Sequence, residues 1–350
     1  MHLISTLKMK INRHIKHKFM NAEKYKALEV TEEAAGKFAL NIVYKSVTEP
    51  LDGEVLVRVR YSSLNYKDAL SASGNRGVTR QYPHTPGVDA AGVIAVSRSP
   101  DWEKGDEVIV TGFDLGMNTN GGFAEYITVP SKWLVRLPEG LSLRQSMAYG
   151  TAGFTAGLSI MALIRHGMKP ENGAVAVTGA TGGVGSAAVA MLAKLGYHVM
   201  AVSSKAASHD FLLSMGAREV IPRQEVEDQS GKALLKPRFA AAIDTVGGQV
   251  LATVIKSLHY GGVVTTCGMV NGGELHTTVF PFILKGVQLI GIDSVATPHT
   301  LRAAIWQKLA AEWMPPQLEL LTHEIGLEQL PEAITTILNG KMQGRTIVRI

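Results

Sequence analysis

The stretch AVAVTGATGGVGSAAVAMLAKLG, residues 174–196, decides the fold. It opens with an apolar run typical of a buried strand and continues as a helix-like pattern that ends at Gly196. Gly179, Gly182 and Gly185 lie between these parts as a G-x-x-G-x-x-G turn. A dinucleotide-binding turn needs such glycines, because its backbone approaches a pyrophosphate closely and its helix packs tightly on the strand. A turn with only a structural role is the alternative.

The amides at the start of this helix are the predicted phosphate ligands. They stand at the positive end of the helix dipole, where unpaired amides bind anions. They belong to Thr181, Gly182, Gly183 and Val184. Further along the chain, apolar runs alternate with helical patterns as far as about residue 313. This alternation predicts a doubly wound parallel sheet.

The first part of the chain has a different pattern. Residues 54–64 alternate apolar and polar side chains, as a half-buried strand does. Similar short segments follow at 87–96, 106–112 and 124–130, and together they predict a barrel-like β domain. The strand at 345–350 comes too late for the parallel sheet and is expected to rejoin the β domain.

The predicted fold class is therefore α/β, with two domains. We expect a β-barrel domain over 22–144 and 314–350, and a dinucleotide-binding domain over 145–313. Residues 1–21 are expected to form a disordered basic tail, or an over-long start before Met20. Apolar residues recur there every four positions, so an amphipathic presequence is a further alternative.

Charge and cysteine content exclude several classes of protein. Five of the 35 Lys and Arg residues lie within residues 1–19, which hold no acid, so the rest carries 30 basic against 30 acidic residues. A neutral body without a basic stripe is not typical of nucleic-acid binding. Cys267 is the single cysteine, which excludes a disulfide framework and a multi-thiolate metal site and favours a cytoplasmic protein. No run of about 18 apolar residues is free of Gly or charge, so no membrane span is expected.

The end of the second strand indicates which nicotinamide coenzyme binds. An NAD-binding strand places Asp or Glu about 20 residues past the glycines, where the carboxylate accepts from the ribose 2′-hydroxyl. Ser203, Ser204 and Lys205 stand at that place, and Asp210 comes too late. Hydroxyls and a cation suit a 2′-phosphate, which Arg223 could also reach. NADPH is therefore the expected coenzyme, and a solvated Lys205 is the plainer alternative.

Motifs spread over residues 22–350 resemble the medium-chain dehydrogenase/reductase superfamily, which joins a GroES-like β-barrel domain to a Rossmann domain. They are SSLNYKD, PGVDAAG, GGFAEY, GTAGFTA, VTGATGGVG and GRTIV. Zinc-dependent members carry Gly-His-Glu where this chain has Gly87, Val88 and Asp89, and they also have a four-cysteine lobe. With Cys267 alone, neither zinc site is expected. The chain is most similar to the zinc-free acrylyl-CoA reductases, which are also named quinone oxidoreductases.

The resemblance also implies which residues form the site. Asn65, Asp68, Asp89 and Arg345 match a polar cluster in the cleft between the domains, which is either catalytic or a structural network. Beyond the glycine turn, the implied coenzyme contacts are Tyr66, Ser203, Ser204, Lys205, Arg223, Met269, Ile283, Ser294 and Asn339.

The implied reaction is the NADPH-dependent reduction of the carbon–carbon double bond of acryloyl-CoA to propanoyl-CoA, by hydride transfer without a metal. NADPH-dependent quinone reduction and a nicotinamide-binding protein with incidental turnover are the alternatives. The expected partners are a small acyl-CoA thioester or a quinone, and neither nucleic acid nor a membrane. The edge strand expected at 288–294 would expose unpaired backbone groups, so a homodimer is also expected.

Overall fold

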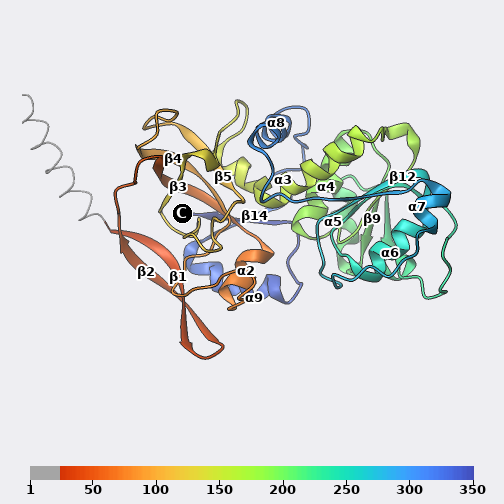
Figure 1. The fold of residues 1–350 in the computed structure, drawn as a ribbon, viewed down its shortest axis with the longest axis horizontal. Coiled ribbons are helices and arrows are strands. Elements are labelled where there is room, and N and C mark those ends of the chain that lie inside the picture. The colour runs from red at the N-terminus through yellow and green to blue at the C-terminus, as the bar shows by residue number, and fades with distance from the viewer. Residues whose placement is uncertain (1–23) are drawn as a thin grey trace, which may run out of the picture.

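The computed structural model describes residues 24–350 as two lobes that lie side by side (Figure 1). The lobe on the left of the figure is built mainly from strands, and the lobe on the right holds a parallel sheet with helices packed along it. The expected α/β fold class, with a β-barrel-like part and a doubly wound part, is confirmed by the strand order. The expected tail over residues 1–21 lies outside the described residues.

The parallel sheet has the strand order β10-β9-β8-β11-β12-β13, and every neighbouring pair runs parallel. The chain therefore winds outward in both directions from the β8–β11 pair. A sheet of this kind binds nucleotides in the crevice at the carboxyl ends of its strands. Its strands are Val175–Val177 (β8), Val199–Ser203 (β9), Glu219–Pro222 (β10), Phe239–Asp244 (β11), Leu258–Thr266 (β12) and Gln288–Gly291 (β13).

The longest helix among residues 24–350 is α3, Leu143–Arg165. It begins at Ser142, whose hydroxyl accepts the amide of Gln145 at 3.1 Å, and it bends at Gly150, where φ is 52°. By length and composition α3 could cross a membrane, but 78% of its most apolar window is buried inside the fold, as in the core helix of a soluble protein. The other helices of this lobe are Gly183–Lys194 (α4), His209–Ser214 (α5), Gly248–Lys256 (α6), Phe280–Lys285 (α7) and His299–Ala310 (α8).

The β lobe contains a seven-stranded sheet with the order β14-β15-β3-β4-β5-β7, and β6 pairs with β3 outside this path. A separate antiparallel hairpin, β1–β2, precedes it. The strands are Lys24–Ala34 (β1), Lys37–Ser46 (β2), Glu54–Leu64 (β3), Asp89–Ser97 (β4), Glu107–Thr111 (β5), Tyr126–Pro130 (β6), Leu134–Arg136 (β7), Thr322–Gly326 (β14) and Arg345–Arg349 (β15). Two helices lie beside them, Tyr66–Ala72 (α2) and Leu330–Leu338 (α9).

The last strand of the chain, β15, lies in the β lobe. It pairs antiparallel with β3, with Thr346 opposite Leu64, and parallel with β14. The expected return of this strand to the β domain is therefore confirmed, and it brings Arg345 beside the end of β3. The domain bounds 22–144, 314–350 and 145–313 stay a prediction.

The expected helices differ from the observed ones mainly at their ends. The helix expected at 300–313 ends at Ala310, because Ala311 has the non-helical angles φ −127° and ψ −106°. One apolar core joins α3 and α8, where the rings of Phe154 and Trp306 stack with centroids 5.9 Å apart. Both rings are fully buried, so α3 holds a fixed position between the lobes.

Candidate functional site

The glycine turn between β8 and α4 has the backbone that a dinucleotide needs. Gly179 adopts φ +59°, a region that favours glycine, and its carbonyl accepts the amide of Gly182 at 2.9 Å. A Cβ on Gly185 would lie only 2.3 Å from that carbonyl oxygen, so the helix start can pack on the turn only through glycine. Gly182 is the N-cap of α4, and the first amides of a helix have no partner within it.

Three neighbouring strands bring the expected coenzyme residues to one edge of the sheet. β8 leads into Thr181 and Gly182, β9 ends at Ser203, and Arg223 follows β10. Because these strands are parallel neighbours, their carboxyl ends meet at the same edge. The residues present therefore fit a nicotinamide dinucleotide with its pyrophosphate at the glycine turn.

The loop after β9 carries the residues expected at the ribose phosphate. The hydroxyl of Ser203 accepts the amide of Lys205 at 3.0 Å, and Ser204 is exposed. The ammonium of Lys205 donates to the carbonyl of Met342 at 2.9 Å, and partial burial lowers the pKa of this lysine. Lys205 is thus held in place rather than free in solvent, which argues against the plainer alternative for it.

Arg223 already has protein partners. Its guanidinium donates to Glu227 at 2.7 Å and to the side-chain oxygen of Asn271 at 2.7 Å. A carboxylate that pairs with Arg223 offsets the charge a 2′-phosphate would meet there. The role of Arg223 in binding this phosphate stays a prediction, and it has less support than that of Lys205.

The remaining expected coenzyme residues are spread over both lobes. Tyr66 is the first residue of α2, and Asn339 follows α9 as its C-cap. Met269 and Ile283 are 74% and 71% exposed, and the carbonyl of Ser294 accepts a hydrogen bond from Arg302. Within residues 24–350, no hydrogen bond links these five to the glycine turn, so their contacts with the coenzyme stay predictions.

The four residues expected in the cleft form one connected cluster with Asp89 at its centre. Its carboxylate accepts from the hydroxyl of Ser63 at 2.6 Å and from the side-chain amide of Asn65 at 2.7 Å. It also accepts from the backbone amide of Thr151 at 2.9 Å and from the hydroxyl of that residue at 2.5 Å. Asp89 is fully buried, so these donors replace the water that a carboxylate would otherwise need.

Arg345 supplies the positive charge of the cluster. It donates from Nη1 to Asn65 at 3.2 Å, from Nη2 to Ser63 at 2.8 Å and from Nε to the carbonyl of Ala148 at 3.2 Å. Its Nη2 lies 3.9 Å from Asp89. Burial lowers the pKa of Arg345, and the neighbouring carboxylates act against this shift.

Asp68 lies in α2, next to this network. Its carboxylate accepts three backbone amides, from Asn65 at 2.7 Å, Val88 at 2.8 Å and Gly87 at 3.1 Å. Complete burial, followed by repulsion from Asp89, raises the pKa of Asp68 to about 7, against the lowering effect of the three amides. Asp68 therefore fixes the start of α2 against the loop that leads into β4.

The cluster lies against the glycine turn. A Cβ on Gly183 would lie 3.0 Å from Nη1 of Arg345, and a Cβ on Gly150 would lie 2.5 Å from the carboxylate of Asp89. The bend of α3 at Gly150 is thus what lets the cluster close between the lobes. The structure brings the polar cluster and the coenzyme turn together at one place.

The donors of Asn65 and Arg345 are used inside the cluster. The amide nitrogen of Asn65 donates to Asp89 and to the carbonyl of Ser63, and Arg345 has the partners given above. Tyr66, the next residue, is 46% exposed, and its hydroxyl has no hydrogen-bond partner among residues 24–350. The arrangement favours Asn65 and Arg345 as positioning residues and leaves Tyr66 as the available donor.

Sequence reasoning missed three members of the cluster: Ser63, Gly150 and Thr151. Each stands inside a motif that resembled the superfamily, SSLNYKD for the first and GTAGFTA for the other two. The motifs were therefore a usable signal. The contact between Thr151 and Asp89, which lie far apart in the chain, had no local signal at all.

The residues at this place do not fit a zinc ion. Among residues 24–350, no group of three or more His, Cys, Asp or Glu side chains could hold a metal ion. Val88, which stands where zinc enzymes have histidine, has no ligand atom in its side chain. Asp89 meets four protein donors, and a metal ion would have to replace them.

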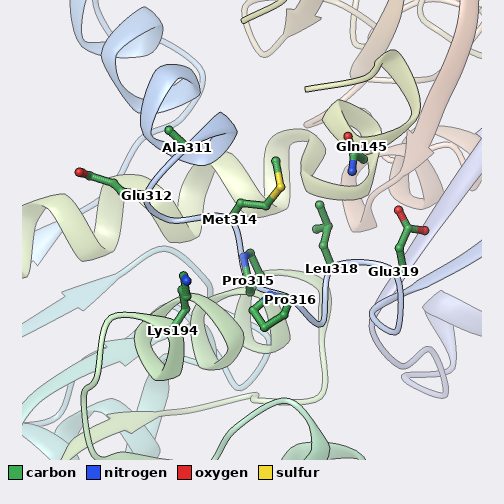
Figure 2. Close-up of a pocket in the computed structure, with 9 residues that line it drawn as sticks. All are labelled: Gln145, Lys194, Ala311, Glu312, Met314, Pro315, Pro316, Leu318 and Glu319. Atoms are coloured by element: carbon green, nitrogen blue, oxygen red, sulfur yellow. The ribbon is translucent and has the colours of Figure 1, made fainter. Parts of the chain in front are cut away.

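A surface hollow of about 460 Å³ lies away from this site (Figure 2). Figure 2 shows Lys194 on one side of it and Met314, Pro315 and Leu318 on the segment that follows α8. Lys194 is the last residue of α4, and the glycine turn precedes the first residue of that helix. Twelve helical residues, about 18 Å, separate the two, so the hollow is not part of the coenzyme site.

Two protein families match the chain. The family described as "Alcohol dehydrogenase GroES-like domain" matches residues 51–139, and the family described as "Zinc-binding dehydrogenase" matches residues 183–311. The two matches fall on the β lobe and on the lobe with the parallel sheet. The second description mentions zinc, which the described residues, 24–350, do not support.

Three proteins illustrate the similarity. The acrylyl-CoA reductase AcuI of Ruegeria pomeroyi is 42% identical over 319 residues, 91% of this chain and 97% of that protein. The crystal structure of the yhdH oxidoreductase of Salmonella enterica in complex with NADP is 45% identical, with a TM-score of 0.89 over 93% of this chain and 99% of that one.

The third is YhfP of Bacillus subtilis, whose name places it provisionally among the quinone oxidoreductases. It is 47% identical over 302 residues, 86% of this chain and 91% of that protein. Its crystal structure with NAD bound has a TM-score of 0.91 over 94% of this chain and 100% of that one. The descriptions of these proteins name two activities, acrylyl-CoA reductase and quinone oxidoreductase, and two coenzymes, NADP and NAD.

Proposed function

The chain belongs to the medium-chain dehydrogenase/reductase superfamily, and from this premise we propose that it is an NADPH-dependent acrylyl-CoA reductase. The observation that carries the proposal is the contact between the glycine turn and the Asn65–Asp89–Arg345 cluster. It joins a coenzyme site to a buried polar cluster, and hydride transfer to a small substrate requires polar groups beside the coenzyme. Relatives named for this reaction match the chain over almost its whole length.

NADPH is the coenzyme. The loop after β9 offers Ser203, Ser204 and Lys205 and no carboxylate, and the ammonium of Lys205 is already positioned. Similar structures were solved in complex with NADP and with NADPH. The structure of YhfP was solved with NAD bound.

When bound, NADPH would supply a hydride from nicotinamide C4 to the β-carbon of an α,β-unsaturated thioester, and a proton from water or from a side-chain acid would complete the reduction at the α-carbon. Negative charge then develops on the thioester oxygen, and a positioned donor stabilises it. We assign this donor role to the hydroxyl of Tyr66, because this hydroxyl has no hydrogen-bond partner among residues 24–350. The donors of Asn65 and Arg345 already form hydrogen bonds inside the cluster.

Asn65 and Arg345 then act by position. Asn65 precedes α2 and is bound on both sides, to Asp89 and to Arg345, while Asp68 fixes its backbone amide. These bonds hold Asn65, the N-cap of α2, against Arg345, which itself lies against Gly183 of the glycine turn. Asp68 and Asp89 contribute through the residues they hold and not through contact with substrate.

Quinone reduction with NADPH is the second candidate function. The name of YhfP favours it, and the reaction needs an apolar slot and no contact with a thioester. The two candidates differ in what Tyr66 contributes. A quinone takes two electrons without passing through a thioester enolate, so its reduction depends less on one donor at that place.

We propose a homodimer in the cytoplasm. β13 is the edge strand of the parallel sheet, so one side of it presents unpaired backbone groups. Several exposed apolar side chains come shortly before β13 in the sequence: Met269, Val270, Val279, Phe280, Ile283 and Leu284. A second copy would cover both features. Light scattering at micromolar concentration should give about twice the 37.5 kDa of one chain.

The function is tested by following the oxidation of NADPH with acryloyl-CoA and, separately, with a benzoquinone. The proposal expects turnover with acryloyl-CoA and formation of propanoyl-CoA. Turnover with the quinone alone would favour the second candidate. If NADPH is oxidised neither with acryloyl-CoA nor with the benzoquinone, the result would favour a nicotinamide-binding protein with incidental turnover.

A further inference from the structure

The loop between α9 and β15 touches the loop after β9 at two points. The carbonyl of Met342 accepts the ammonium of Lys205 at 2.9 Å, and the side-chain oxygen of Gln343 accepts the hydroxyl of Ser208 at 3.1 Å. The contacting residues are more than 130 positions apart in the chain. Lys205 and Ser208 lie in the loop that follows β9 of the parallel sheet. Met342 and Gln343 precede β15 of the β lobe.

The next residues of the same loop continue toward the reaction site. The amide of Gly344 donates to the carbonyl of Thr181 in the glycine turn at 2.9 Å, and Arg345 enters the polar cluster. Four consecutive residues therefore contact the loop after β9, the glycine turn and the cluster in turn. The α9–β15 loop is the segment that connects all three.

We propose that Gln343 and the main chain of Met342 are positioning elements of the 2′-phosphate site. The preference for NADPH over NADH then depends on the α9–β15 loop as well as on the parallel sheet and its loops. This inference rests on the proposed use of NADPH. It adds to that function two residues that do not belong to the parallel sheet or its loops.

The physical reason is pre-organisation. A lysine side chain is long and flexible, and a free one loses much of its conformational freedom when it binds a phosphate. The Met342 carbonyl takes one of three ammonium donors of Lys205 and leaves two for an anion. The Gln343 contact fixes Ser208, which is buried and ends the turn that carries Lys205. Much of the ordering has thus taken place before the phosphate arrives.

Calorimetric titration with adenosine 2′,5′-bisphosphate and with AMP isolates this site from catalysis. The first ligand has the 2′-phosphate, and the second lacks it. In Gln343→Ala, the affinity for the bisphosphate should fall about three- to tenfold, the loss expected for one positioning hydrogen bond. The affinity for AMP should stay within about twofold of wild type.

Gln343→Glu provides a sharper variant. Glutamate keeps an oxygen that can accept from Ser208, but it adds a negative charge next to the proposed phosphate position. The bisphosphate should bind more weakly to Gln343→Glu than to Gln343→Ala, and salt should narrow the difference. Gln307→Ala is the matched control, because Gln307 is exposed on α8 and has no side-chain partner among the described residues.

Thermal melts of all variants complete the experiment. Gln343 is exposed, so the melting temperatures should stay close to wild type. Unchanged bisphosphate affinity in both Gln343 variants would overturn the inference, and so would an equal loss for both nucleotides, which indicates a purely structural role. If wild-type protein bound the two nucleotides equally well, the use of NADPH would itself be wrong, which is a different result.

Discussion

The side-chain amide of Asn65 donates to the carboxylate of Asp89 at 2.7 Å, and the oxygen of the same amide accepts from Arg345 at 3.2 Å. Asn65 therefore stands between a buried anion and a buried cation and satisfies both. Because its polar atoms are used within the fold, its effect on a substrate passes through the residues it holds. This relationship decides how the cluster should respond to substitution.

Arg345→Ala should destabilise the protein by about 3–5 kcal/mol, because it leaves the carboxylate of Asp89 buried without its positive neighbour. Arg345→Lys should recover only part of this loss, since one ammonium cannot reproduce bonds to Asn65, Ser63 and Ala148. Urea unfolding of the three proteins measures both effects. Wild-type stability in Arg345→Ala would show that the buried carboxylate of Asp89 does not need its positive neighbour.

Tyr66→Phe should lower kcat with acryloyl-CoA by a factor on the order of 10²–10³, the usual cost of losing one donor to a developing oxyanion. The melting temperature should change little, because the Tyr66 hydroxyl has no partner within residues 24–350. Stopped-flow single turnovers separate the chemical step from coenzyme binding. If kcat is retained, the donor must be a coenzyme hydroxyl or a backbone amide.

Asp68 should make stability depend on pH. Burial raises its pKa to about 7 in the folded chain, so between about pH 4 and 7 the folded state binds more protons than the unfolded state. Stability from this group is therefore lost as pH rises through that window, by at most about 1.4 kcal/mol per pH unit.

The free energy of unfolding of wild type and of Asp68→Asn, measured from pH 5 to pH 8, isolates this contribution. The difference between the two proteins should drift in favour of the variant as pH rises. A difference that is constant across the range would mean that the three amides keep Asp68 ionised throughout.

Lys205→Ala should weaken NADPH far more than NADH. A charge-assisted contact to the 2′-phosphate contributes roughly 1.5–3 kcal/mol, so wild type should prefer NADPH at least tenfold and the variant should lose most of this preference. Steady-state kinetics with each coenzyme gives the ratio. Equal use of NADH and NADPH by wild type would refute the assignment.

Features with a local pattern could be predicted from the sequence. The strand expected at 54–64 has the bounds of β3, although the exposed positions are only Arg58 and Arg60, and residues 55–57 and 62–64 are buried on both faces. The glycine turn could also be predicted, because the need for glycine at Gly179 and Gly185 arises from contacts within a few residues of the turn. The parallel order of the sheet then followed from the alternation of strands and helices.

Features set by distant contacts could not be predicted in the same way. The bend at Gly150 interrupts a continuous helical pattern, and only the closeness of Ser63 and Asp89 explains it. β14 could not be predicted because it is an edge strand, which is mostly exposed and lacks a clear alternation of apolar and polar residues. The motif around Asn65 indicated the right place, but only the structure shows that its amide is fully occupied.

The central claim is that this chain reduces the double bond of acryloyl-CoA with NADPH through a site in which Tyr66 is the free donor. The most direct measurement is the initial rate of NADPH oxidation by wild type and Tyr66→Phe, each with acryloyl-CoA and with a benzoquinone. The account predicts wild-type turnover with acryloyl-CoA to propanoyl-CoA, and a loss in the variant that is much larger for the thioester than for the quinone. Wild-type turnover with the quinone and none with acryloyl-CoA would contradict it.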